Sequence, residues 1–145
     1  MNARETVVLL VENDADVELG IAVTLQRSSP PTLLRSVPTG EMAVQYLAGE
    51  PPFDDREEYP IPEVIILDLK LPGISGFDLL SWRWMRESLR TVPVLALVEA
   101  YDLQGRERAL ALGANAIQEK PLDYTLIRPI VEELIRAQAV QATGP

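Results

Sequence analysis

The sequence predicts an α/β fold in which a five-stranded parallel sheet carries helices on both of its faces. Short apolar and β-branched runs alternate along the chain with longer segments of helical period, and this is the pattern of repeated βα units. Five such units can be counted. The chain has 145 residues, which is a usual length for one domain. We therefore expect a single domain over residues 1–145, with a frayed tail at 140–145.

Each unit has its own strand and helix signals. The expected strands lie at Thr6–Val11, Thr32–Val37, Val64–Leu67, Val92–Val98 and Ala116–Glu119. The expected helices begin near Asp14, Gly40, Ser75, Asp102 and Asp123 and end near Leu25, Ala48, Leu89, Gly113 and Gln141. Residues 49–62 are rich in proline and acid and exceed the about 2 to 6 residues usual for such a connection, so they predict a surface insertion.

Three of these helices have recognisable N-terminal caps. Thr39 and Asp102 precede the second and fourth helices, and Ser75 with Asp78 forms a capping box for the third. We expect Asp14 to act as an acid of the first helix's N-terminus. Trp82 and Trp84 lie two residues apart on the third helix, so one of them must be at least partly exposed, as a rim residue or a partner contact. We expect the charged run 54–58 to form a solvated loop. The alternative is a segment that binds a partner.

Composition excludes several classes of function. The chain has 13 basic and 22 acidic residues and a formal charge of −9, which is the wrong sign for binding nucleic acid. It has no cysteine and no histidine, so disulfides, thiolate zinc sites and imidazole-based catalytic triads are excluded. The longest strongly apolar run, Val92–Val98, is far shorter than a membrane span, and the N-terminus has no signal-peptide core. We expect a soluble cytoplasmic protein with no nucleic-acid or membrane partner.

Chemistry on an open parallel sheet gathers at the carboxyl ends of the strands. The residues expected at that edge are Glu12, Asn13, Asp14, Asp68, Val98, Glu99 and Lys120. Carboxylate and amide oxygens beside an ammonium suit a hard cation such as Mg²⁺ and a paired lysine. The chain has only two lysines, Lys70 and Lys120, and both are expected at this edge.

Four segments together resemble the receiver domain of bacterial two-component response regulators. They are Leu10–Asp14, Ile66–Gly76, Gly113–Ala116 and the pair Lys120-Pro121. The resemblance covers about residues 5–138 and implies a CheY-like, flavodoxin-like (βα)5 sandwich with strand order 2-1-3-4-5. The insertion at 49–62 is similar to that of single-domain receivers that serve phytochrome-type kinases.

The resemblance also implies a phosphorelay function and its residues. Asp68 is then the phospho-acceptor, which takes a phosphoryl group from a sensor histidine kinase, and Lys120 pairs with Asp68 or its phosphate. Mg²⁺ is held by Glu12, Asp68, the backbone carbonyl of Lys70 and, more weakly, Asn13. No enzymatic activity is expected beyond self-phosphorylation.

We expect no room for an output domain after residue 141, so the output should be a downstream protein or a homodimer. In this family the contact commonly involves the face formed by the fourth helix, the fifth strand and the fifth helix. The candidate contact residues there are Tyr101, Leu103, Ile117 and Ile127.

Three positions depart from the family pattern. Asn13 replaces a second acid that ligates the metal, Val98 replaces a serine or threonine, and Ile117 replaces an aromatic switch residue. These departures favour an alternative, a phosphorylation-independent pseudo-receiver that works as an interaction module. An enzyme or flavin carrier on the same fold is disfavoured, because the acidic loop 12–16 would repel a phosphate and has no serine, threonine or glycine to bind one.

Overall fold

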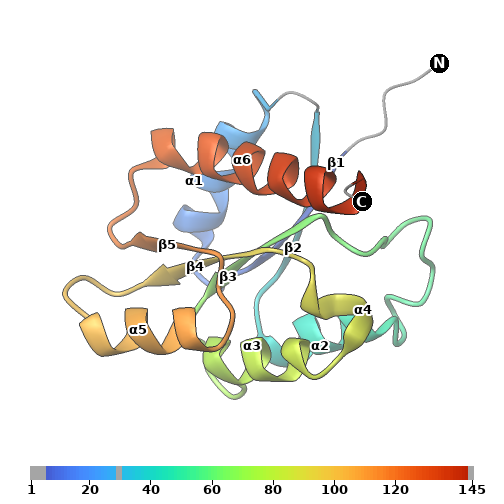
Figure 1. The fold of residues 1–145 in the computed structure, drawn as a ribbon, viewed down its shortest axis with the longest axis horizontal. Helices are drawn as coiled ribbons and strands as arrows, with labels where there is room; N and C mark the ends of the chain where they lie inside the picture. Colours follow the sequence, from blue (N-terminus) through green and yellow to red (C-terminus); the bar gives the residue numbers. More distant parts are fainter. Residues whose placement is uncertain (1–5, 29–30, 144–145) are drawn as a thin grey trace.

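The computed structural model describes residues 6–28 and 31–143 (Figure 1). Its centre is one parallel sheet with the strand order β2-β1-β3-β4-β5, as the sequence predicts. The strands are β1 (Thr6–Val11), β2 (Thr32–Val37), β3 (Val64–Asp68), β4 (Val94–Val98) and β5 (Ala116–Glu119). The order reverses beside β1, so β1 and β3 are neighbours although β2 separates them in the chain.

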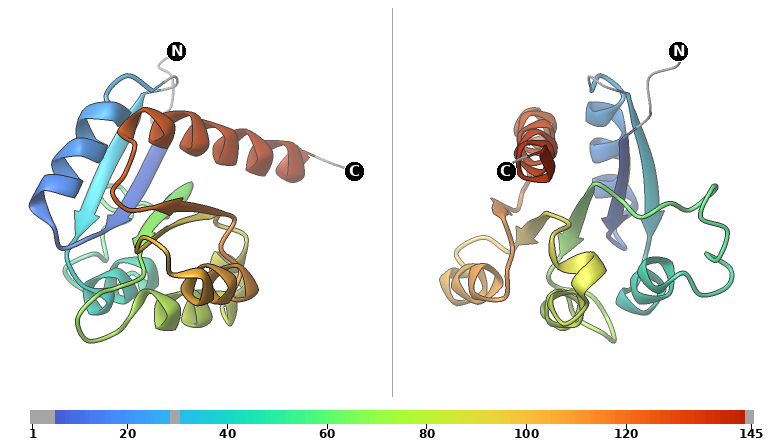
Figure 2. Two further views of the ribbon diagram at one scale, coloured as in Figure 1. Left: turned by 90° about the vertical axis from the view of Figure 1, so that its left-hand side faces the viewer. Right: turned by 45° about the vertical axis from the view of Figure 1, so that its right-hand side comes forward.

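Within residues 6–28 and 31–143, six helices cover the two faces of this sheet (Figure 2). They are α1 (Ala15–Leu25), α2 (Gly40–Ala48), α3 (Gly76–Trp84), α4 (Glu87–Arg90), α5 (Leu103–Ala111) and α6 (Tyr124–Thr143). Helices α1 and α6 pack on one face, and α2, α3, α4 and α5 lie on the other. No helix among residues 6–28 and 31–143 is long and apolar enough to cross a membrane.

The strand side chains divide between two cores because successive residues of a strand point to opposite faces. Leu9 and Ile65 belong to the core under α2, α3, α4 and α5. Their neighbours Leu10 and Ile66 belong to the core under α1 and α6. Both sets are fully buried, which explains why these strands read as continuous apolar runs.

The predicted caps are confirmed. The Thr39 hydroxyl accepts from the Met42 N–H at 3.1 Å, and Asp102 accepts from the Gly105 N–H at 2.9 Å. Ser75 and Asp78 make both bonds of the capping box. These caps satisfy N–H groups that the first turn of a helix leaves without a partner.

The predicted end of the third helix is wrong, because the helix does not continue to Leu89. It ends at Trp84, Arg86 is extended, and the short helix α4 follows. The buried Arg83 side chain donates to the carbonyls of Arg90 at 3.2 Å and Val92 at 3.0 Å, and these bonds hold the turn that leads into β4. Strand β4 accordingly begins at Val94 and not at Val92.

The C-terminal helix is longer than predicted. Helix α6 extends to Thr143, so residues 140–143 of the expected frayed tail are helical, while residues 144–145 lie outside the described part of the chain. Pro129 lies inside this helix.

The insertion at 49–62 is packed against the domain although it has no helix or strand of its own. Phe53 is buried, and its ring lies 5.3 Å from that of Tyr46 and 5.2 Å from that of Tyr59. The Arg56 guanidinium donates to the carbonyls of Tyr46 and Leu47, at the end of α2, and of Tyr59. The acids of the run 54–58 are exposed as expected, but Arg56 binds the insertion to the end of α2 through these hydrogen bonds.

Candidate functional site

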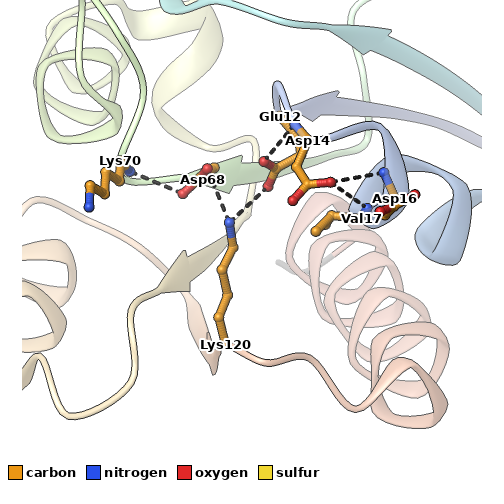
Figure 3. A network of polar contacts seen from close by, with 7 residues as sticks. All are labelled: Glu12, Asp14, Asp16, Val17, Asp68, Lys70 and Lys120. Carbon is orange, nitrogen blue, oxygen red and sulfur yellow. Dashed lines mark hydrogen bonds and ion pairs between the residues drawn. The ribbon is translucent and has the colours of Figure 1, made fainter.

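Three charged side chains meet at the carboxyl edge of the sheet (Figure 3). The ammonium nitrogen of Lys120 lies 3.2 Å from Oδ2 of Asp68 and 3.3 Å from Oε2 of Glu12. Glu12 and Asp68 are both buried, with 2% and 3% of their surface exposed. One cation therefore stands between two carboxylates that are almost closed to solvent.

The strand order explains this meeting. Glu12 follows β1 and Asp68 ends β3, and these strands are neighbours in the sheet. Lys120 follows β5, and β4 lies between β5 and β3, so its long side chain must cross the end of β4. The Lys120 N–H donates to the Val98 carbonyl at 2.8 Å, which fixes the start of that crossing. The Lys120–Pro121 peptide bond is cis.

The loop after β3 holds the Asp68 carboxylate from the other side. Its Oδ1 accepts from the backbone N–H of Lys70 at 3.0 Å, while the Lys70 side chain is exposed. The loop returns so closely at Gly76 that a Cβ there would lie 2.5 Å from Leu69 Cα and 2.6 Å from the Asp68 carbonyl oxygen. This close approach is the physical reason for a glycine eight residues after the aspartate.

The electrostatics follow from burial and from the three charges. Burial and the neighbouring Asp68 carboxylate raise the pKa of Glu12, and Lys120 offsets only part of this. Burial alone would lower the pKa of Lys120, but the Asp68 and Glu12 carboxylates outweigh it and raise that pKa. The ammonium is therefore firmly protonated at neutral pH.

Asp14, the next acid of the loop after β1, points away from this group (Figure 3). Asp14 turns toward α1 and accepts from the Asp16 and Val17 N–H groups at 2.9 and 3.3 Å, which confirms its predicted role at the helix start. Asn13 is exposed. Within the described ranges no three acids, histidines or cysteines group in a way that could hold a metal ion. The two carboxylates that face Lys120 at this edge are those of Glu12 and Asp68.

The five residues predicted as switch positions or contact residues differ in exposure. Val98 is buried with 2% exposure, and Ile117 is half-buried against the core. Tyr101 and Leu103 are exposed, at 91% and 69%. Ile127 is fully buried, so its prediction as a contact residue is wrong: it lies on the side of α6 that faces the sheet.

The structure adds a contact that the sequence did not reveal. Glu119, on β5, accepts from the Tyr101 N–H at 3.3 Å and pairs with Arg106 of α5 at 3.1 Å. These two bonds hold the β4–α5 loop against β5. No spacing rule connects these residues, because their contact depends on the pairing of β4 with β5.

Comparison with known proteins identifies the family. The family model described as "Response regulator receiver domain" matches residues 8–132. The chain belongs to this family. This receiver is 27% identical over 128 residues to the probable methanogenesis regulatory protein FilR2 of Methanothrix harundinacea, and the match covers 88% of this chain and 80% of FilR2.

Some curated relatives are longer. The receiver spans 55% of the cell cycle response regulator CtrA of Brucella ovis, to which it is 29% identical over 142 residues, or 94% of this chain.

Solved structures share the fold over almost the whole chain. The phosphorylated cyanobacterial phytochrome response regulator RcpA aligns with a TM-score of 0.80 and 24% identity, over 98% of this receiver and 99% of that chain. The response regulator RPA3017, described in red light signaling of R. palustris, aligns with a TM-score of 0.74 and 27% identity, over 93% and 92%. The predicted fold class is thereby confirmed.

Proposed function

We propose that this receiver accepts a phosphoryl group on Asp68 from the phosphohistidine of a sensor histidine kinase and acts as a stand-alone member of a phosphorelay. The observation that carries the proposal is the position of the Asp68 carboxylate. One of its oxygens accepts from the Lys70 N–H and the other lies against the Lys120 ammonium, so the group is oriented and lies beside a positive charge.

The chemistry needs a carboxylate nucleophile and a cation. An Asp68 oxygen forms a bond to phosphorus as the bond from phosphorus to the donor imidazole nitrogen breaks, and that nitrogen keeps the electron pair. The receiver's own part is to fix the nucleophile and to hold the Lys120 charge beside the transferred group. Such positioning and neutralisation is the main source of catalysis in phosphoryl transfer.

The oxygen donors fit Mg²⁺. Glu12 Oε2 lies 3.3 Å from the Lys120 ammonium and accepts no other hydrogen bond from the described part of the chain, which leaves lone pairs available beside Asp68. Mg²⁺ commonly binds through one or two carboxylates and keeps several waters. We assign Glu12, Asp68, the Lys70 carbonyl and, more weakly, Asn13 to hold it, and the ion would neutralise charge on the transferred group.

The partners follow from the same family. The likeness to RPA3017, described in red light signaling, supports a phytochrome-type sensor kinase as the donor. Exposed Tyr101 and Leu103 support a protein contact beside the β4–α5 loop, made with a downstream protein or a second copy. The cytoplasmic location that the sequence predicts stays a prediction.

Three observations favour a second candidate, a pseudo-receiver that signals without phosphorylation. Asn13 brings no charge to the site, so the affinity for a cation should be lower than with three acids. Val98 has no hydroxyl to bind a phosphoryl oxygen and draw the β4–α5 loop inward. Ile117, which replaces the aromatic switch residue, is consistent with the same reading.

Intact mass after incubation with acetyl phosphate, with and without Mg²⁺, separates the two candidates. A single Mg²⁺-dependent phosphoryl adduct that is absent in Asp68→Ala supports the phospho-acceptor. The variant Asn13→Asp serves as the matched control for the metal, because it restores a third acid. If only Asn13→Asp forms the adduct, or no variant does, the phosphorylated switch is refuted and the pseudo-receiver stands.

A further inference from the structure

Tyr101, in the β4–α5 loop, has a backbone conformation that residues with a side chain rarely adopt. Its φ is 64°, and among the described residues it is the only one other than glycine with a positive φ. A bulky residue stays in this region only when the contacts around it hold it there. The Tyr101 side chain can supply few such contacts, because 91% of the residue is exposed. Its backbone must therefore be held by other groups.

The Glu119 carboxylate, on the paired strand β5, provides the bonds that hold this backbone. Its Oε1 accepts from the Tyr101 N–H at 3.3 Å, and its Oε2 accepts from the Arg106 guanidinium of α5 at 3.1 Å. One oxygen thus binds the strained residue, and the other binds the helix that follows it. We refer to these two bonds as the Glu119 bridge.

The remaining hydrogen bonds of the loop are local. The Asp102 N–H donates to the Glu99 carbonyl at 3.2 Å, and the Leu103 N–H donates to the Tyr101 carbonyl at 3.1 Å. In the part of the chain that the structure describes, no hydrogen bond joins residues 99–102 to the side chains of the three charged residues of the site. The loop is therefore bound to β5 and α5, and not to the charged edge of the sheet.

The side chains of Val98 and Ile117 offer no hydrogen bond that could replace the bridge. A phosphoryl group on Asp68 can move the loop only if it binds the loop more strongly in one position than in another. Val98, the last residue of β4, is buried and has methyl groups where a hydroxyl would be needed. Ile117 is apolar and packs against the core.

We propose that Glu119 is the positioning residue of the β4–α5 loop, and that the Glu119 bridge holds Tyr101 and Leu103 in one exposed conformation whether or not Asp68 carries a phosphoryl group. The bridge is complete in the chain without that group, so the conformation does not depend on the proposed function. Only its consequence rests on that function: a receiver of this kind signals by passing the phosphoryl group on, while its contact surface stays the same.

Amide hydrogen exchange at Tyr101, measured on the full chain, tests the bridge. Glu119→Ala removes the acceptor, so this N–H should exchange about fivefold faster, the factor for one hydrogen bond of ordinary net strength. Glu119→Gln keeps an acceptor oxygen and should exchange at nearly the native rate. Glu99→Ala is the matched control, because it removes an exposed acid of the same loop and keeps the carbonyl that binds Asp102. Equal rates for Glu119→Ala and the native chain would overturn the bridge.

A double-mutant cycle tests whether the bridge holds the positive φ. Tyr101→Gly removes the strain, and the unfolded-state cost of a glycine is the same in each background and cancels. In urea unfolding, Tyr101→Gly should raise the folding equilibrium constant at least about fivefold more in the native chain than in Glu119→Ala, where the loop is free to leave the strained conformation. Equal effects in the two backgrounds would overturn the role of Glu119.

Phosphorylation tests the independence from Asp68. The ¹H–¹⁵N signals of Tyr101 and Lys70 are compared with Mg²⁺ alone and with Mg²⁺ and acetyl phosphate, and the Lys70 N–H reports the modification because it donates to Asp68. A shifted Lys70 signal with an unmoved Tyr101 signal supports the proposal, and a shift of both overturns it. If Lys70 does not shift, the proposed function fails instead. Asp68→Asn then changes the charge of the site directly, and a moved Tyr101 signal would overturn the proposal, whereas an unmoved one supports it.

Discussion

Replacing Lys120 by methionine tests the charge balance at the centre of the site. The substitution keeps the length of the side chain but leaves the Asp68 and Glu12 carboxylates without the ammonium that lies 3.2 and 3.3 Å from them. Removing one partner of a buried pair usually costs about 3 to 5 kcal/mol. In this receiver the cost has a limit, because Glu12 can take up a proton.

That limit sets the magnitude. Keeping Glu12 protonated at pH 7 against its ordinary pKa of 4.5 costs 1.36 × (7 − 4.5), or about 3.4 kcal/mol. At pH 5 the same product is about 0.7 kcal/mol. Since the pKa of Glu12 is already raised in the native chain, part of this cost is already present. We expect Lys120→Met to lower the free energy of unfolding by about 2 to 3 kcal/mol at pH 7 and by less than about 1 kcal/mol at pH 5.

Urea unfolding followed by circular dichroism at the two pH values, with EDTA present, measures both quantities. The control is Lys70→Met, whose side chain is exposed and whose backbone N–H to Asp68 is retained, and it should change stability by no more than about 0.5 kcal/mol. An equal loss for Lys120→Met at both pH values would refute the proton-uptake reasoning. A loss below about 1 kcal/mol at pH 7 would refute the pairing itself.

Four further outcomes are expected. The native chain should lose stability as the pH rises beyond 10.5, because Lys120 loses its stabilising charge when the pH passes its raised pKa. The urea midpoint of the native chain should therefore fall in this pH range, and the urea midpoint of Lys120→Met should show no such fall. Gly76→Ala should cost about 1 to 3 kcal/mol in thermal unfolding, since its Cβ would meet backbone atoms. Arg56→Ala should cost at least about 2 kcal/mol for three lost bonds to carbonyls, against almost no change for the exposed neighbour in Glu57→Ala. Asn13→Asp should tighten Mg²⁺ binding several-fold in a calorimetric titration, and an unchanged affinity would remove Asn13 from the proposed metal ligands.

The site could be predicted from the sequence to the extent that strand ends define it. Glu12, Asp68 and Lys120 each lie at or directly after the end of a predicted strand, and a parallel sheet brings such positions to one edge. The sequence therefore predicted that these three residues lie together, and in the structure the Lys120 ammonium lies within 3.3 Å of both carboxylates. Which oxygen faces Lys120, and how far each group is buried, depends on the course of the loop after β3.

The errors of prediction have the same origin. A helical period continues from residue 76 to 89. The buried Arg83 guanidinium, however, donates hydrogen bonds to backbone carbonyls that lie beyond the predicted helix end, and these bonds turn the chain toward β4. Ile127 was predicted as a contact residue only through the face that the family resemblance implies, and the rotation of α6 on the sheet buries it. Arg56 reads as a member of a charged loop, and only its reach to the end of α2 shows its role.

By itself the sequence determined the order of the strands and of every helix except α4, the caps, the two-faced burial of the strands and the identity of the charged edge. These features depend on period, cap chemistry and chain order, which are local properties. Only the tertiary structure decided which partners the polar ends of long side chains bind. Arginine and glutamate reach several ångströms from their backbone, so the partners of Arg56, Arg83 and Glu119 are set by the elements that pack beside them and not by their neighbours in the chain.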